Sequence, residues 1–172
     1  MSNKKIKSPK QLVKIISKYK KKKRKIAFTN GCFDILHPGH ISYLEEAKRK
    51  SDVLIVALNA DSSVRRIKGQ ARPISKLRDR QRIVAALESV DYVTSFSETT
   101  PLRLISRLKP DLLIKGGDWK ATDIVGRKVV AKYGGKAVSV KYKKGYSTSS
   151  IVKKIKKSSL RGGRGPTKQF QK

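Results

Sequence analysis

The segment I-A-F-T-N-G-C-F-D-I-L-H-P-G-H-I-S-Y-L-E-E-A-K-R-K-S-D-V-L-I-V-A-L-N-A-D, residues 26–61, decides the fold. Short apolar runs at residues 26–28 and 53–58 are bounded by polar residues, which is typical of buried strands. Between them, residues 37–50 carry apolar side chains at helical spacing. A strand, a helix and a second strand in this order predict a right-handed crossover between parallel strands.

The remaining chain continues this alternation of strands and helices. Further strands are expected at residues 92–93, 112–114 and 137–140, and further helices near residues 77–87, 101–108 and 123–131. Ser75 is expected to cap the helix near 77–87 and to leave four apolar side chains facing the sheet, those of Leu77, Ile83, Val84 and Leu87. The predicted fold class is α/β, with a Rossmann-like, doubly wound parallel sheet of about five strands in a single domain.

The loop after the first strand and the start of the first crossover helix suggest a phosphate site. Gly31 permits a tight turn, and the helix N-terminus offers free N–H groups and partial positive charge. His37 and His40 lie on one helical face, with Gly39 removing a side chain between them. A capping histidine beside a surface one, or half of a metal site, would show the same spacing. Zinc is disfavoured because the chain has two histidines and one cysteine.

The second strand is followed by polar and basic residues at the same edge of the sheet. Asn59 and Asp61 are expected to border the crevice, although Asp61 also suits a helix N-cap. Residues 65–72 are predicted to form a mobile basic loop that folds over a triphosphate and excludes water. A solvated loop without function is the alternative.

Two later segments add candidate ligand contacts. The strand ending at Lys115 is followed by paired glycines and by Asp118 and Trp119, which suit a phosphate, a hydroxyl or base amine, and a stacking or anchoring role. Residues 147–149, Ser-Thr-Ser, precede the last helix. One of them must be its N-cap, and hydroxyl groups at a helix N-terminus also bind phosphate.

The charge of the chain is unusual and uneven. Among 172 residues, 43 are Lys or Arg and 12 are Asp or Glu, so the net charge is +31. Residues 1–24 and 153–172 contain 11 and 8 basic residues and no acidic ones. One cysteine excludes an internal disulfide, and no segment has transmembrane length or a signal-peptide core. We therefore expect a cytoplasmic protein.

Three regions are expected along the chain. Residues 1–24 form a basic segment with an amphipathic helix docked on the domain, residues 25–155 form the domain, and residues 156–172 form a basic disordered tail. The alternative for the N-terminal helix is contact with nucleic acid or an anionic membrane surface.

The motif T-N-G-C-F-D-I-L-H-P-G-H resembles the signature of the H-x-G-H nucleotidyltransferase (cytidylyltransferase-like) superfamily. Within that group, the chain most resembles the D-glycero-β-D-manno-heptose 1-phosphate adenylyltransferase domain of bacterial heptose-phosphate enzymes. Later segments agree in order and spacing, among them L-I-V-A-L-N-A-D-S-S, R-I-K-G-Q-A-R-P-I, P-D-L-L-I-K-G-G-D-W and G-Y-S-T-S-S-I-V-K-K-I. The resemblance covers roughly residues 25–155.

The resemblance implies a role for individual residues. It implies catalytic roles for His37, His40 and Lys68. It implies nucleotide or phosphate contacts for Thr29, Asn30, Gly31, Cys32, Phe33, Gly39, Arg80, Ser147, Thr148 and Ser149. Acceptor-substrate contacts are implied for Asp34, Asn59, Asp61, Lys115, Gly117, Asp118 and Trp119.

The implied reaction transfers AMP from ATP to a sugar 1-phosphate, most closely heptose 1-phosphate, and gives an ADP-sugar and pyrophosphate. Mg²⁺ is expected on the triphosphate with no dedicated protein ligands, together with a homodimer and a separate sugar kinase. A cytidylyltransferase acting on glycerol 3-phosphate with CTP remains open, although Tyr142 stands where those enzymes carry an arginine. A non-catalytic binder of nucleic acid or anionic surfaces, using the basic ends, also remains open.

Overall fold

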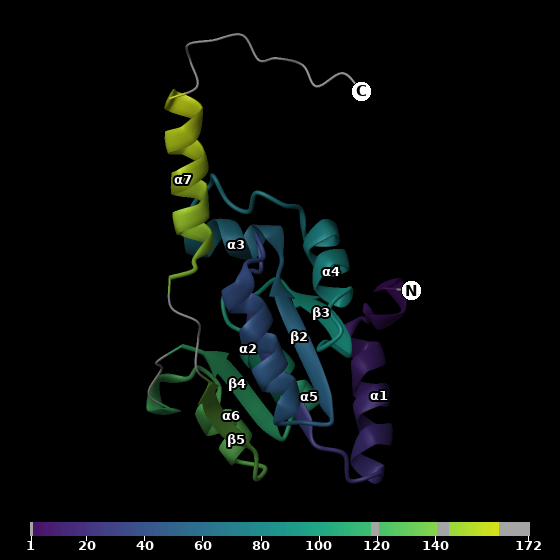
Figure 1. Cartoon of the computed structure of the whole chain (residues 1–172). Coiled ribbons are helices and arrows are strands. Elements are labelled where there is room, and N and C mark those ends of the chain that lie inside the picture. Colours follow the sequence, from purple (N-terminus) through teal and green to yellow (C-terminus); the bar gives the residue numbers. More distant parts are fainter. Residues whose placement is uncertain (1, 118–120, 141–144, 162–172) are drawn as a thin grey trace.

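The computed structural model describes residues 2–117, 121–140 and 145–161 (Figure 1). Within these ranges, parallel strands form one sheet in the order β3-β2-β1-β4-β5, which confirms the expected Rossmann-like architecture. The strands are β1 (Ile26–Gly31), β2 (Val53–Asn59), β3 (Tyr92–Phe96), β4 (Leu112–Gly116) and β5 (Lys136–Val140).

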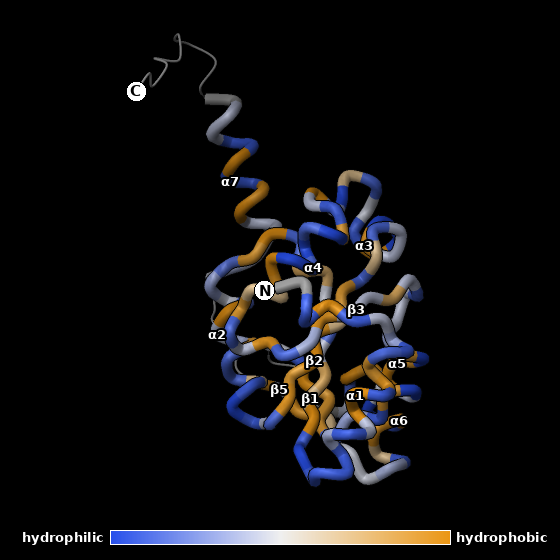
Figure 2. The backbone as a smooth tube through the Cα atoms, turned by 90° about the vertical axis from the view of Figure 1, so that its right-hand side faces the viewer, coloured by the Kyte–Doolittle hydropathy of each residue, from blue (hydrophilic) through white to orange (hydrophobic). Residues whose placement is uncertain are grey.

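Helices cover both faces of the sheet. They are η1 (Ser2–Lys5), α1 (Pro9–Lys21), α2 (Pro38–Arg49), α3 (Asp61–Lys68), α4 (Leu77–Ala85), α5 (Leu102–Leu108), η2 (Ala121–Asp123), α6 (Arg127–Ala131) and α7 (Thr148–Arg161). Figure 2 shows the sheet between two layers, with α2 on one side and α1, α5 and α6 on the other. Within the described ranges, no helix is both long and apolar enough to cross a membrane.

The central strands are buried on both faces, so alternate side chains enter two separate cores. In β2, Leu54 and Val56 pack in the core under α2 and α4. Ile55 and Ala57 pack in the opposite core, under α1, α5 and α6. This two-sided burial explains why the strands appear in the sequence as continuous apolar runs.

The structure differs from the sequence expectation in the segments that follow β1 and β2. β1 continues to Gly31, because Asn30 and Gly31 remain in register with Ala57 and Leu58 of β2. Residues 61–68 form helix α3, which includes residues 65–68 of the expected basic loop, so the connection to α4 is limited to residues 69–76.

In helix α4, three of the four apolar side chains expected to face the sheet do so, those of Leu77, Val84 and Leu87, but Arg80 rather than Ile83 is buried. Ile83 is 49% exposed and Arg80 is fully buried. The N-cap is Lys76, and Ser75 does not cap the helix. Apolar spacing alone placed Ile83 inward, since it could not anticipate a buried guanidinium.

The last helix is longer than expected. α7 continues to Arg161, so residues 156–161 are helical rather than part of a disordered tail. In Figure 1 this helix rises from the body beyond the carboxyl end of the sheet.

The N-terminal segment packs on the sheet through α1. Ser8 and Gln11 form a capping box at the start of α1, and the helix buries Leu12 and Ile16 against the α5 side of the sheet. Before the helix, Ile6 forms a parallel bridge with Val93 of β3. The basic segment is therefore part of the folded domain.

We predict that Leu12→Ala lowers the free energy of unfolding by about 2–5 kcal/mol, because the side chain is fully buried and its removal leaves a cavity. Lys14→Ala, at an exposed position of the same helix, should change it by about 0.5 kcal/mol or less. Urea unfolding of both variants tests this. Equal losses would mean that the helix is not docked.

Candidate functional site

The candidate site lies at the carboxyl ends of the strands. The chain adds β2 and β3 on one side of β1 and then β4 and β5 on the other side. The direction of the strand order therefore switches between β1 and β4, which is where a ligand crevice is expected. Asn30 and Lys115 are the next-to-last residues of β1 and β4, and Lys115 Nζ donates to Asn30 Oδ1 at 2.7 Å. These two predicted residues therefore meet directly.

The two histidines lie together at the start of α2. His37 is the N-cap residue in extended conformation, and Pro38 fills the first helical position, where no N–H is needed. The rings of His37 and His40 stack with centroids 3.8 Å apart. The helix N-terminus adds free N–H groups and partial positive charge beside them.

His40 has a buried ring nitrogen without a hydrogen-bond partner among the described residues, Nδ1. Burial, and secondarily the charge of His37, lowers the pKa of His40 to about 4. Burial also lowers the pKa of His37. Both imidazoles are therefore neutral at pH 7, when each can donate one hydrogen bond and accept another.

The start of α7 reaches the same place. Thr148 Oγ1 donates to the carbonyl of Ile35 at 3.2 Å, two residues before His37. The ring of Tyr146 lies nearly parallel to that of His37, with centroids 6.4 Å apart. Ser147 Oγ accepts from the Ser150 N–H at 3.0 Å and acts as the cap. The Ser-Thr-Ser segment and the histidine pair therefore share one region, as expected.

The positive charges of basic side chains influence the loop between β1 and α2. Burial raises the pKa of the Cys32 thiol, and the charges of Lys68, Arg80 and Arg72 oppose this effect. Lys68, the last residue of α3, is therefore close enough to this loop for its charge to be felt there.

Arg80 is placed differently from the sequence expectation, because its side chain is fully buried. Its Nε donates to the Ser75 carbonyl at 2.9 Å, and its NH1 donates to the Cys32 carbonyl. NH2 bonds the Asn59 carbonyl at 2.9 Å and the Asp61 carboxylate at 2.7 Å. The guanidinium thus joins four protein segments.

The three polar residues expected at the acceptor also bond within the protein. Asp34 is buried and accepts from Arg72, Ile74 and Ser75. Asn59 Nδ2 donates to Ser63 Oγ at 2.9 Å, and Asp61 pairs with Arg80. Asp61 is the first residue of α3 and not its cap, which is Ala60. These side chains therefore support the crevice through bonds within the protein.

The remaining predicted residues line or support the loop. Thr29 is buried and bonded to Tyr43. Phe33 has a φ of 47° and places its ring 5.1 Å from that of His40, centroid to centroid. Gly117 has a φ of 110°, which favours glycine. Asp118 and Trp119 lie outside the described residues.

Two open spaces adjoin these groups. One, of about 400 Å³, lies against the first turn of α2 and is lined by Leu36, His37, Pro38, Ile41 and Ser42. The other, of about 190 Å³, is lined by Asn30, Thr99, Thr100, Pro101, Lys115, Asp123, Ile124 and Val125. Asn30 of β1 and Lys115 of β4 both line the second space, so this space continues the crevice.

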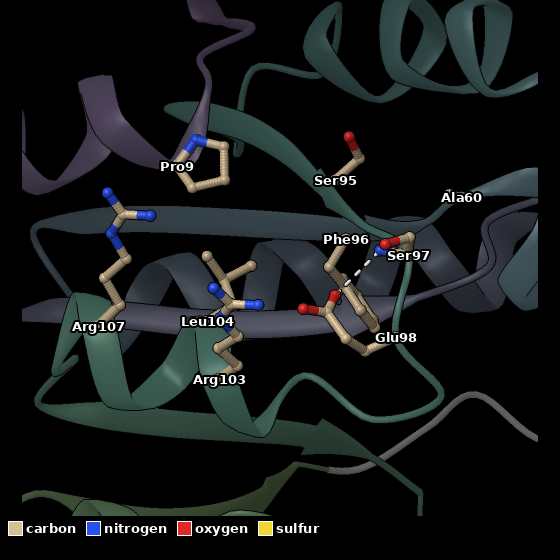
Figure 3. Close-up of a pocket in the computed structure, with 9 residues that line it drawn as sticks. All are labelled: Pro9, Ala60, Ser95, Phe96, Ser97, Glu98, Arg103, Leu104 and Arg107. Atoms are coloured by element: carbon tan, nitrogen blue, oxygen red, sulfur yellow. Dashed lines mark hydrogen bonds between the residues drawn. The ribbon is translucent and has the colours of Figure 1, made fainter.

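A further cleft of about 340 Å³ lies between the start of α1, the end of β3 and α5 (Figure 3). Arg103 and Arg107 come from α5, and the Glu98 carboxylate accepts from the Ser97 N–H at 3.1 Å. Its lining shares no residue with the two spaces above. This cleft is therefore separate from the histidine site.

The described residues contain no group of three or more His, Cys, Asp or Glu side chains that could hold a metal ion. Two carboxylates beside the site, those of Asp34 and Asp61, are paired with Arg72 and Arg80.

Two residues were not singled out from the sequence. Arg72 holds Asp34, and Tyr146 lies beside His37. Arg72 was noted only as one of four basic residues in a loop, because its partner is 38 positions away in the chain. For Tyr146, the only sequence feature that pointed to the site was its position next to the Ser-Thr-Ser segment.

The lowered pKa of His40 predicts a stability profile. Its folded pKa of about 4 lies below the unfolded value of 6.5, so the unfolded chain binds the proton more readily. This stabilisation is complete above pH 6.5 and is lost as the pH falls toward 4, by at most about 1.4 kcal/mol per pH unit. Urea unfolding at pH 7, 6 and 5 should show a shallower loss in His40→Gln than in the wild type. Parallel curves would contradict the assignment.

The sequence matches a family described as Cytidylyltransferase-like over residues 28–154. A Bifunctional protein HldE of Pasteurella multocida (strain Pm70) is 49% identical over 150 residues, 87% of this chain and 32% of that protein. The protein of the same name from Geobacter metallireducens (strain ATCC 53774 / DSM 7210 / GS-15) is 50% identical over 154 residues, 90% of this chain and 31% of that protein. The chain thus spans about a third of the length of these curated relatives.

Solved structures agree with this match. The lipopolysaccharide core biosynthesis protein from Thermoplasma volcanium GSS1 has 30% identity and a TM-score of 0.59, covering 72% of this chain and 99% of that chain. A pantoate-beta-alanine ligase from Francisella tularensis, complexed with beta-gamma ATP and beta-alanine, shares the fold with a TM-score of 0.62, 21% identity and coverage of 96% and 81%. With its matched segment running from β1 into α7, the chain belongs to the cytidylyltransferase-like family.

Proposed function

We propose that the protein transfers AMP from ATP to a sugar 1-phosphate, with heptose 1-phosphate as the acceptor. The observation that carries the proposal is the meeting of the stacked His37–His40 pair with the first residues of α7 at the N-terminus of α2. Two helix N-termini and two neutral imidazoles at one place form a site for a polyphosphate.

The choice of ATP and heptose phosphate is supported by sequence. The H-P-G-H motif and the later segments resemble heptose-phosphate adenylyltransferase domains, and relatives named Bifunctional protein HldE are about half identical over most of this chain. A 30%-identical solved structure is named a lipopolysaccharide core biosynthesis protein.

We place the triphosphate between the histidine pair, Lys68 and the start of α7. His37 and His40 would donate hydrogen bonds to the α-phosphoryl oxygens as charge develops there. Lys68 and the Ser147–Ser149 segment would hold the departing pyrophosphate. Mg²⁺ would enter as the ATP complex, bound by phosphate oxygens and water, because few protein carboxylates are available.

The acceptor is assigned to the space beside Asn30 and Lys115. Its volume of about 190 Å³ is below the roughly 300–1,000 Å³ of pockets for drug-sized ligands, which suits a monosaccharide. Burial lowers the pKa of Lys115 to about 8, and a bound phosphate would favour its charged form. Hydroxyl groups of Thr99 and Thr100 and the carboxylate of Asp123 can bond sugar hydroxyls.

The reaction then needs no strong base. An ionised oxygen of the sugar phosphate attacks the α-phosphorus of ATP, the bond from that phosphorus to the bridging oxygen of the β-phosphate breaks, and pyrophosphate leaves. Positioning of the two phosphates and stabilisation of charge supply the catalysis.

We predict that His37→Ala or His40→Ala lowers kcat by about 10²–10³-fold, the scale of losing one oxyanion donor. Glu45→Gln, at an exposed position further along α2, is the control and should keep wild-type turnover. Pyrophosphate release measures all three. Near-normal turnover in both histidine variants would exclude the proposed role.

The substrates are tested by pyrophosphate release from ATP and from CTP across a panel of sugar and polyol phosphates. We expect turnover with ATP and heptose 1-phosphate, with the ADP-sugar confirmed by mass spectrometry. Turnover with CTP and glycerol 3-phosphate would instead establish a cytidylyltransferase. No turnover with any pair would overturn the proposal.

A further inference from the structure

Asp34 joins two segments that are distant in sequence. Its side chain is 1% exposed and, among the described residues, accepts hydrogen bonds from the connection between α3 and α4. Oδ1 accepts from the N–H groups of Ile74 and Ser75, each at 2.9 Å. Oδ2 accepts from Nε of Arg72.

This carboxylate is charged although it is buried. Burial by itself would raise the pKa of Asp34, but the N–H groups of Ser75 and Ile74 and the Arg72 guanidinium together hold it below its usual value. A buried charge is tolerated when donors satisfy its oxygens, and the loss of one partner leaves the other uncompensated. The interaction is therefore specific for a carboxylate and a guanidinium.

The bonded segments carry the groups assigned to the triphosphate. Asp34 precedes Ile35, whose carbonyl binds Thr148, and stands three residues before His37. On the other side, Arg72 stands four residues after Lys68, where α3 ends. The Asp34–Arg72 contact therefore ties the segment that follows Lys68 to the segment that precedes the histidine pair.

We propose that Asp34 and Arg72 form a positioning pair, which fixes the α3–α4 connection against the loop before α2 and so sets the place of Lys68 at the triphosphate. Neither side chain is assigned contact with substrate. The inference rests on the proposed function, since it concerns the same site. It replaces the expectation that Asp34 binds the acceptor.

The principal test is Asp34→Asn, which keeps the size of the side chain and turns an NH₂ group toward N–H donors. We expect kcat to fall about 10–100-fold, because a displacement near 1 Å costs that order of rate. KM for the sugar phosphate should stay within about twofold, since the acceptor space contains neither residue. Hydrogen exchange at Ile74 and Ser75 should become faster.

Asp52→Asn is the matched control. Asp52 also accepts from an arginine, Arg24, and from a backbone N–H, that of Lys25, but at the amino end of β1 and β2. Asp52→Asn should leave kcat and the hydrogen exchange of residues 69–76 unchanged. An equal effect of both variants would show general destabilisation and would overturn the proposal.

Arg72 gives a second route if Asp34→Asn fails to fold. Arg72→Gln should reduce kcat, and Arg72→Lys should recover part of it, since an ammonium can still pair with the carboxylate through one donor. Unchanged kcat and unchanged exchange in Arg72→Gln would refute the positioning pair.

The two proposals fail in different ways. A wild type without AMP transfer to any acceptor would overturn the proposed function only. The positioning pair would then be tested by hydrogen exchange at Ile74 and Ser75 and by the Kd for ATP. In Asp34→Asn and Arg72→Gln the exchange should be faster and ATP binding weaker. Wild-type values of both would overturn the pair alone.

Discussion

The buried guanidinium of Arg80 connects the segments that form the crevice. It donates to the carbonyls at the ends of β1 and β2, to the first residue of α3 and to the carbonyl two residues before α4. A fully buried arginine is stable only when its donors are satisfied, so the four acceptors must stay in place together. The geometry of the crevice consequently depends on one cation that no ligand needs to contact.

The site combines neutral and charged groups in a protein of very high positive charge. The two imidazoles are neutral because they are buried, whereas the charges of Lys68 and Arg72 act on Cys32 in the loop before them. Neutral donors can approach a phosphorus without fixing an anion too strongly in the ground state. Cations at the rim can still attract a triphosphate from solution.

Much of the fold could be predicted from the sequence, because the parallel strands are buried on both faces and are therefore apolar throughout. The histidine pair and the Ser-Thr-Ser segment were also found, since a helix N-terminus imposes local constraints on residue type. The bonds that Asp34, Asp61 and Arg80 make within the protein were not predicted. The partners Arg72 of Asp34, and Cys32 and Asp61 of Arg80, lie 38, 48 and 19 positions away, and local patterns contain no information on such pairs. A buried ion pair and a ligand contact have the same appearance in sequence.

The bridge between Ile6 and Val93 covers part of the outer side of β3. β3 ends the sheet, and its outer side would present unpaired N–H and carbonyl groups, which attract strands of other molecules. The Lys7 N–H instead donates to the Val93 carbonyl at 2.9 Å. Lys4 and Lys5 come just before this point in the sequence. The first residues of the chain thus protect a sheet edge from edge-to-edge aggregation, and their positive charge adds repulsion between copies.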